Sequence, residues 1–249
     1  MSEFLWQARA ALVVAKKNAM VYYLKPPVFT FGIIFPFFFY LAFAAGRNAP
    51  PETMAPGIVA MALFFTASAV GPLVTPWERQ AKTYERLITS PASLIAILSG
   101  DVLAGTGFGV LLALLPLAIA TLATAAAVAA FLPLVLGIVL GSLSFAALGV
   151  LLAAPATQGP SQVMMLSNLV RLPLIFVSGV FIPVSQMPGW GRWLAPLSPL
   201  SYCADLIRSG FGETHYWSIL TDVTALCAFI IGFMFLAARW HKKTRDRAN

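Results

Sequence analysis

Charged side chains gather in one short stretch of this sequence, Trp77–Ala92, which lies between two long apolar runs. Read as a helix, the stretch places Glu78 four residues before Lys82, the spacing at which opposite charges pair. One side of the helix would then be charged, and the other would carry Trp77 and Tyr84. Such an amphipathic helix can lie along a membrane surface and offer its charged side to a water-soluble partner. A solvated loop whose charges only set membrane topology is the alternative.

Catalytic and metal-binding arrangements have little support in the sequence. His215 and His241 are separated by an apolar run that places them on opposite sides of a membrane, so they should not share a metal ion, and both are expected at the surface. Cys203 and Cys227 do not indicate a disulfide framework. A membrane-embedded enzyme would need clustered His, Asp, Glu or Cys residues. The sequence also contains no G-x-x-x-x-G-K-[ST] phosphate loop, so this chain is expected neither to be an enzyme nor to bind ATP in the usual way.

The elements that carry these residues are membrane helices. Hydrophobic residues make up 59% of the 249-residue chain, charged residues make up 10%, and the mean hydropathy is +0.85, values typical of an integral membrane protein. Near-continuous apolar runs predict an all-α fold, because lipid offers the backbone no hydrogen-bond partner and a membrane barrel would show alternation. We expect six spans: 28–46, 54–76, 102–124, 131–153, 162–183 and 218–240.

Basic residues indicate the orientation of these spans. With the N-terminus inside, Arg79, Lys82 and Arg86 and the basic C-terminal end face the cytoplasm, as the positive-inside rule requires. Both termini are therefore expected in the cytoplasm. The net charge of +7 is then a topology signal, and no nucleic-acid partner is expected.

Two segments outside the spans have unusual patterns. Residues 1–27 mix apolar and basic side chains, which predicts an interfacial helix ahead of a retained first span. The segment 184–216 is placed outside by the topology, yet it stays apolar and rich in Pro, Gly and Trp. It fits one or two short re-entrant helices dipping into the outer leaflet. A plain extracellular loop lying on lipid remains the alternative.

Ionisable residues near the spans need partners or water. Arg171 lies well inside the fifth span, where an unpaired charge is costly, so it should face a wet cavity or pair with a carboxylate. A role in the transport path or its gating and a structural ion pair are equal alternatives. Asp101 and Asp222 mark the starts of the third and sixth spans and are expected to be solvated at the interface.

Two motifs resemble those of the permease subunits of ABC-2 type transporters, a family of six-helix exporters. Glu78-Arg79 followed by Thr83, Glu85, Leu87 and Ser90-Pro91 resembles the first cytoplasmic loop of that family. Met187-Pro188 followed by Pro199-Leu200-x-Tyr202 and Arg208 resembles its C-terminal signature. With the span count, the resemblance covers nearly the whole chain. The sequence departs from the family pattern at Lys82, where glycine is frequent, and at Val177.

The resemblance implies a single transmembrane domain, 1–249, with a role for each segment. Residues 1–27 would form an elbow helix, 77–92 a coupling helix seated on a separate ATPase subunit, and 184–216 a re-entrant pair closing the outer end. The ATPase contacts would come from Glu78, Arg79, Lys82, Thr83, Tyr84, Glu85 and Arg86, with a second, smaller contact through the loop that contains Gln158. Arg171, Tyr202 and Arg208 are the candidates for the transport path or its gate.

The expected function is export across a bacterial or archaeal cytoplasmic membrane. A hydrophobic or lipid-linked substrate suits the apolar interior, whether a drug, a lipid, a glycolipid or a polysaccharide. The chain would bind no cofactor itself, and ATP and Mg²⁺ would lie on the partner ATPase. A second permease copy would complete the pathway within the lipid, and a homodimer is favoured over a heterodimer. An ATP-independent secondary transporter is the alternative, although such proteins usually show internal repeats and helices broken near the midplane.

Overall fold

The computed structural model describes residues 3–21, 30, 34, 37–38, 51–123, 127–155 and 159–246, and each regular element within these ranges is helical. The predicted all-α fold is therefore confirmed. In chain order the elements are α1 (Glu3–Val21), α4 (Pro51–Ser68), α5 (Val70–Gln80), α6 (Thr83–Ile88), α7 (Leu94–Ala123), α8 (Phe131–Leu152), α9 (Pro160–Val177), η2 (Val184–Gln186), α10 (Gly189–Leu194), η3 (Ala195–Leu197), α11 (Pro199–Gly210) and α12 (Ile219–Asp246).

Five segments of the described chain are long and apolar enough to cross a membrane. They are Thr53–Gln80, which combines α4 and α5, and Leu94–Leu122, Phe131–Leu152, Pro160–Val177 and Ile219–Lys243. These match the second to sixth predicted spans. The predicted first span, 28–46, lies outside the described residues apart from four isolated positions.

Local capping explains where two of these spans depart from their predicted ends. α7 begins at Leu94 rather than at residue 102, because the Ser93 hydroxyl accepts the Ala96 N–H at 3.1 Å and caps the first turn. α9 ends at Val177 rather than at residue 183. A turn follows it in which Gly179 has a φ of +79°, a conformation that favours glycine.

Helix α8 lies at the centre of the bundle, in contact with α4, α7, α11 and α12. Phe145 of α8 meets Phe64 of α4 edge to face, with ring centres 5.0 Å apart. A Cβ atom at Gly141 would collide with the Cys203 sulfur of α11, so this glycine permits the close approach of α11. The short helix α11 is thereby built into the core, and nearly all of its residues are buried.

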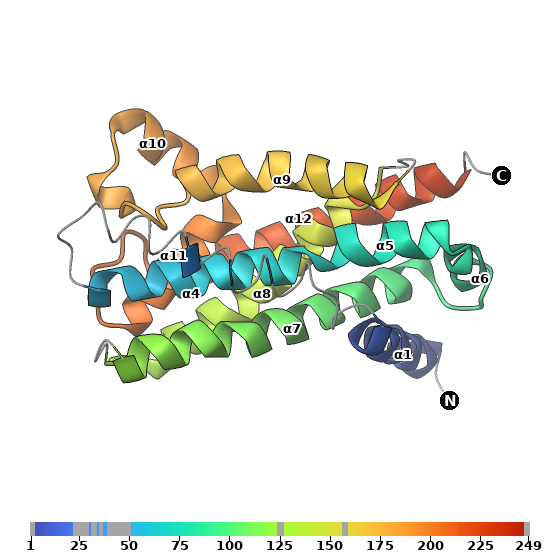
Figure 1. The fold of residues 1–249 in the computed structure, drawn as a ribbon, viewed down its shortest axis with the longest axis horizontal. Coiled ribbons are helices and arrows are strands. Elements are labelled where there is room, and N and C mark those ends of the chain that lie inside the picture. The colour runs from blue at the N-terminus through green and yellow to red at the C-terminus, as the bar shows by residue number, and fades with distance from the viewer. Residues whose placement is uncertain are drawn as a thin grey trace.

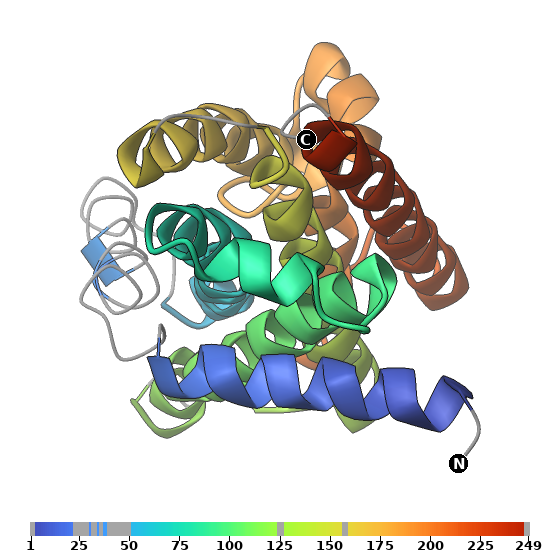
Figure 2. The ribbon, with the colours of Figure 1, turned by 90° about the vertical axis from the view of Figure 1, so that its right-hand side faces the viewer.

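The long helices run side by side and give the molecule two distinct ends (Figure 1). One end carries α6 and both termini, and the other carries α10; we call them the α6 end and the α10 end. Helix α1 differs in direction, because it lies crosswise to the bundle at the α6 end (Figure 2). It packs against α7, where a Cβ atom at Gly100 would lie 2.6 Å from the Ala11 carbonyl oxygen.

Candidate coupling and transport sites

The charged stretch Trp77–Ala92 is not one helix, so that prediction is wrong. α5 ends at Gln80, and α6 begins at Thr83. Between them Lys82 has a φ of +56°, the left-handed conformation that commonly ends a helix. The Thr83 hydroxyl donates to the Glu78 carbonyl oxygen at 3.3 Å and bridges the turn. The helical i,i+4 geometry assumed for Glu78 and Lys82 is therefore absent.

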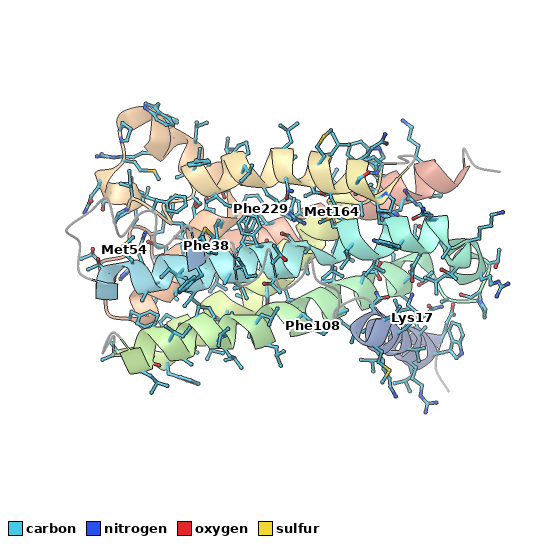
Figure 3. All side chains as sticks on the ribbon, viewed as in Figure 1. Lys17, Phe38, Met54, Phe108, Met164 and Phe229 are labelled. Carbon is cyan, nitrogen blue, oxygen red and sulfur yellow. The ribbon has the colours of Figure 1, made fainter. Side chains whose placement is uncertain are left out.

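Glu78 is buried within the chain. Its residue is 4% exposed, and its carboxylate forms an ion pair with Lys17 of α1; Figure 3 shows Lys17 where α1 meets the bundle. A second contact lies nearby, because the Asn18 side chain donates to the Asp101 carboxylate of α7 at 2.6 Å. Asp101 is buried, so its expected interfacial solvation is wrong. These two polar contacts attach α1 to α5 and α7.

Arg79 and Tyr84 connect the α5–α6 turn with two other parts of the bundle. Arg79 donates to the Pro155 carbonyl oxygen at 3.0 Å, and its guanidinium lies 5.3 Å from the Tyr84 ring centre. The Tyr84 hydroxyl lies 3.3 Å from Nδ1 of His241 in α12. Burial raises the pKa of Tyr84 despite the nearby Arg79 charge, so the phenol remains a neutral donor.

His241 is buried, so its expected surface position is wrong, whereas His215 is exposed as expected. Nε2 of His241 lies 3.2 Å from the Val150 carbonyl oxygen of α8. A neutral ring protonated on Nε2 satisfies both contacts, because it donates to Val150 and accepts from Tyr84. The α6 turn is thus joined through side chains to α8 and α12. Sequence patterns do not indicate the contact between Tyr84 and His241, since the two residues lie 157 positions apart.

The exposed charged side chains that the structure describes in this stretch are basic. Lys82, Thr83 and Arg86 are exposed, and Trp77 is 41% exposed. The side chain of Glu85 and the whole of Gln158 lie outside the described residues. Among the side chains that the structure describes, this turn therefore exposes two cations, and Trp77 at the end of α5 is partly exposed.

Arg171 lies in the middle of the bundle and is 1% exposed. Its guanidinium donates to the backbone carbonyl of Ser68, at the break between α4 and α5. In a continuous helix this carbonyl would accept from residue 72, but Pro72 has no N–H. Arg171 therefore satisfies an acceptor that a proline leaves open. Among the described residues no carboxylate pairs with Arg171, so the structural ion pair, one of the two alternatives, finds no partner there.

Charged side chains at the α10 end hold the backbone of neighbouring loops. Arg208 is buried and donates to the Gly179 carbonyl oxygen at 2.6 Å. The Asp205 carboxylate accepts the N–H groups of Tyr216 at 2.9 Å and Trp217 at 2.8 Å. Together they fix the ends of α9 and α11 and the start of α12.

Tyr202 and Asp222 also lie inside the fold at the α10 end. The Tyr202 ring stacks on Trp217 with centres 4.8 Å apart, and its hydroxyl donates to the Pro196 carbonyl oxygen at 3.2 Å. Asp222 is 1% exposed, so its expected solvation is wrong.

A cavity of about 570 Å³ lies at the α10 end, between the start of α4, the turn after α9 and the loop after α11. Arg208 lines it, whereas Tyr202 and Arg171 do not. The sequence-predicted transport residues are therefore not gathered in one site. Within the described residues no three His, Cys, Asp or Glu side chains are close enough to hold a metal ion.

Comparison with known proteins points to one family. The chain matches the family model of the ABC-2 type transporter over residues 9–211. It is 27% identical over 246 residues to the daunorubicin resistance ABC transporter permease protein DrrB1 of Streptomyces coeruleorubidus, covering 96% of this chain and 84% of that protein. It is 24% identical over 196 residues to the inner membrane transport permease YadH of Escherichia coli K12, covering 79% and 75%.

A third relative is similar over a shorter region. Nodulation protein J of Sinorhizobium fredii is 31% identical over 100 residues, an alignment that covers 40% of this chain and 38% of that protein. This alignment therefore spans well under two thirds of the length of the nodulation protein. The family model, in contrast, spans most of the chain, and this protein belongs to the ABC-2 type transporter family.

Proposed function

We propose that this chain is the permease subunit of an exporter that moves a hydrophobic or lipid-linked substrate out of the cytoplasm. The observation that carries the proposal is the family match over residues 9–211, on a bundle with five helical segments able to cross a membrane. A separate ATPase subunit supplies the energy and binds ATP and Mg²⁺. The alternative of an ATP-independent secondary transporter is less favoured, because both the family and the DrrB1 relative are ABC transporters by description.

The ATPase would bind the α5–α6 turn. Its exposed cations, Lys82 and Arg86, and the partly exposed Trp77 form a surface suited to a groove with acidic groups and an apolar rim. Glu78 and Tyr84 would act from behind this surface, since their side chains are occupied by Lys17 and His241. The loop containing Gln158 would add a smaller contact next to Pro155, whose carbonyl holds Arg79.

Movement of the turn would reach the bundle by two routes. The first route is the contact of Tyr84 with His241 of α12, whose ring also contacts the Val150 carbonyl of α8. The second route runs along α5 to its N-terminal end, next to the helix break at Ser68, where Arg171 of α9 donates to the Ser68 carbonyl. Arg171 would thus be a gating residue that acts on backbone geometry, because a helix break held by one side chain can change its angle without losing regular hydrogen bonds.

The membrane arrangement follows the family. The segment 28–46 would supply the sixth span, and α1 would lie in the cytoplasmic interface with its largely exposed Phe4, Leu12 and Val13 toward lipid. Both termini lie at the α6 end (Figure 1), which supports a cytoplasmic location for both. The re-entrant pair would be α10 and α11. A second copy of the chain would complete the pathway in a bacterial or archaeal cytoplasmic membrane.

Charge reversal at the turn tests the proposal. Lys82→Glu with Arg86→Glu should reduce copurification of the ATPase and abolish most export, because reversing partly desolvated interface charges costs about 2–5 kcal/mol. Lys242→Glu with Lys243→Glu is the matched control, since these exposed α12 residues lie at the same end and change the net charge equally. Wild-type ATPase binding by the turn variant, at normal membrane levels, would remove the coupling role of α5–α6.

A further inference from the structure

The cavity at the α10 end combines an apolar wall with a polar rim. Met54, Ile58 and Met61 of α4 line one side, and Phe181 from the turn after α9 lines another. Gln186 and Glu213 belong to the same lining. Met54 marks the start of α4, far from the α6 end where Lys17 lies (Figure 3). The cavity therefore lies at the end opposite the proposed ATPase surface.

The charges of this cavity balance. Arg208 is 5% exposed, and Nε of its guanidinium has no hydrogen-bond partner within the described structure. That atom lies 3.8 Å from the Glu213 carboxylate, close enough for attraction and too far for a hydrogen bond. A buried donor without an acceptor is costly. The pair thus adds no net charge to the lining, and it leaves the Arg208 guanidinium with a donor that a third group could satisfy.

We infer that this cavity binds an amphiphile with an apolar body and a polar head of zero net charge, either a polyol or a zwitterion. The head would accept from Arg208 and donate, or present positive charge, to Glu213, while the body rests on the methionine wall. This inference builds on the exporter proposed above and assigns a substrate class to it. Methionine side chains suit such a role, because their flexible thioethers adapt to apolar surfaces of different shape.

Singly charged heads fit this cavity less well. An anionic head would be attracted by Arg208 but repelled by the nearby Glu213 carboxylate. A cationic head would be attracted by Glu213 but repelled by Arg208. Each therefore leaves one of the two charges repelled or unpaired, and the cost is larger for Arg208, which is buried, than for Glu213, whose side chain is 27% exposed. The cavity volume of about 570 Å³ is within the range typical of small-molecule sites.

Thiol protection tests the inference on the permease alone, in lipid nanodiscs without the ATPase. Gln186→Cys is introduced at the cavity lining in a background carrying Cys203→Ala and Cys227→Ala, and its labelling by a maleimide is followed at mildly alkaline pH. The probes are octyl glucoside, octyl phosphocholine, octyl sulfate and octyltrimethylammonium, which share one tail. Ser185→Cys is the matched control, because Ser185 is also exposed but does not line the cavity.

The glucoside and the phosphocholine should protect Gln186→Cys at concentrations about tenfold lower than the two charged probes. This ratio corresponds to a difference in binding free energy of about 1.4 kcal/mol. Ser185→Cys should be unaffected by any probe. Adding Glu213→Gln, which leaves Arg208 as the charge of the cavity, should shift the preference to octyl sulfate. Equal protection by the four probes, protection of Ser185→Cys, or no change with Glu213→Gln would overturn the inference.

The binding assay separates this inference from the exporter proposal. Protection by the net-neutral probes without ATP-driven export would leave the cavity site standing and remove the exporter function. Normal export together with no protection of Gln186→Cys by any probe would support the exporter function and overturn the cavity site. Size-exclusion profiles of each variant show whether a lost effect reflects misfolding.

Discussion

The two ends of the bundle use charged and polar side chains in different ways. At the α6 end, side chains join helices that are far apart in the sequence: Lys17 with Glu78, Asn18 with Asp101, and Tyr84 with His241. At the α10 end, charged side chains bind the backbone of nearby loops. Arg208 holds Gly179, Asp205 holds Trp217, and Arg192 donates to the Met187 carbonyl oxygen at 2.9 Å.

This difference indicates what each end can do. Side-chain links between helices allow α1 to move with α5 and α7, and α6 to move with α8 and α12, which suits an end that receives force from a partner. Side chains that fix loop backbone preserve the shape of a cavity while the helices below it move. The comparison therefore predicts that variants at the α10 end reduce stability most and variants at the α6 end mainly reduce coupling.

The largest effect is expected from Asp205→Ala. The carboxylate accepts two backbone N–H groups, and hydrogen bonds to a charged acceptor contribute about 1.5–3 kcal/mol each. The free energy of unfolding should fall by about 3 kcal/mol, measured by thermal unfolding of the purified permease. Asp205→Asn, which keeps one acceptor oxygen, should lose less. A fall below about 1 kcal/mol for the alanine variant would contradict the assignment of loop-holding to this end.

Arg171, between the two ends, should give the next largest effect. Arg171→Met leaves the Ser68 carbonyl without its donor, a cost of about 1–3 kcal/mol, although removing a buried charge offsets part of this. Export should fall more than stability, because the α4–α5 break loses its link to α9. Arg171→Lys keeps a donor and should retain more export at equal expression. Equal export by the two variants would show that the Ser68 contact does not affect transport.

Much of the fold could be predicted from the sequence, because apolar run length alone defines a membrane helix. The second to sixth spans were found this way. The start of α7 was missed although Ser93 carries a recognisable capping signal. The break at Lys82 could not be predicted, since a positive φ at lysine is a local exception that tertiary packing imposes.

The polar contacts of the candidate sites were harder to predict than the helices. The sequence predicts an ATPase contact for Glu78 and Arg79, and that role stays a prediction. The ion pair that buried Glu78 forms is with Lys17, 61 positions away. Arg171 was correctly identified as a costly buried charge. Its partner is a backbone carbonyl that Pro72 leaves open, and no side-chain pairing rule points to it. Periodicity reports which face of a helix is apolar, not which helix covers it.

Glu78→Gln should have a smaller effect on stability than the Asp205 or Arg171 variants. Lys17 is 34% exposed at its side chain, so solvent screens the pair, and we expect a loss of about 1 kcal/mol. Release of α1 should be the visible consequence, measured as faster cleavage by protease within 3–21. A double-mutant cycle with Lys17→Met isolates the pair. Additive effects of the two substitutions would mean that the ion pair does not attach α1.

Tyr84→Phe should have the smallest effect on stability and gives the sharpest comparison of the two ends. It removes one hydroxyl, whose 3.3 Å contact with His241 is worth about 0.5 kcal/mol, the lower end for a neutral hydrogen bond, and keeps the ring that packs near Arg79. The ATPase should still copurify, because Lys82 and Arg86 remain exposed. Export per ATP hydrolysed should nevertheless fall, since the link from α6 to α12 is lost. Thr89→Ala is the control, because it also removes one hydroxyl from this turn, and that hydroxyl donates to the Arg86 carbonyl oxygen at 3.2 Å, within the same turn. If Tyr84→Phe and Thr89→Ala export equally well, the side-chain link to α12 carries no movement, and the two ends differ in packing but not in function.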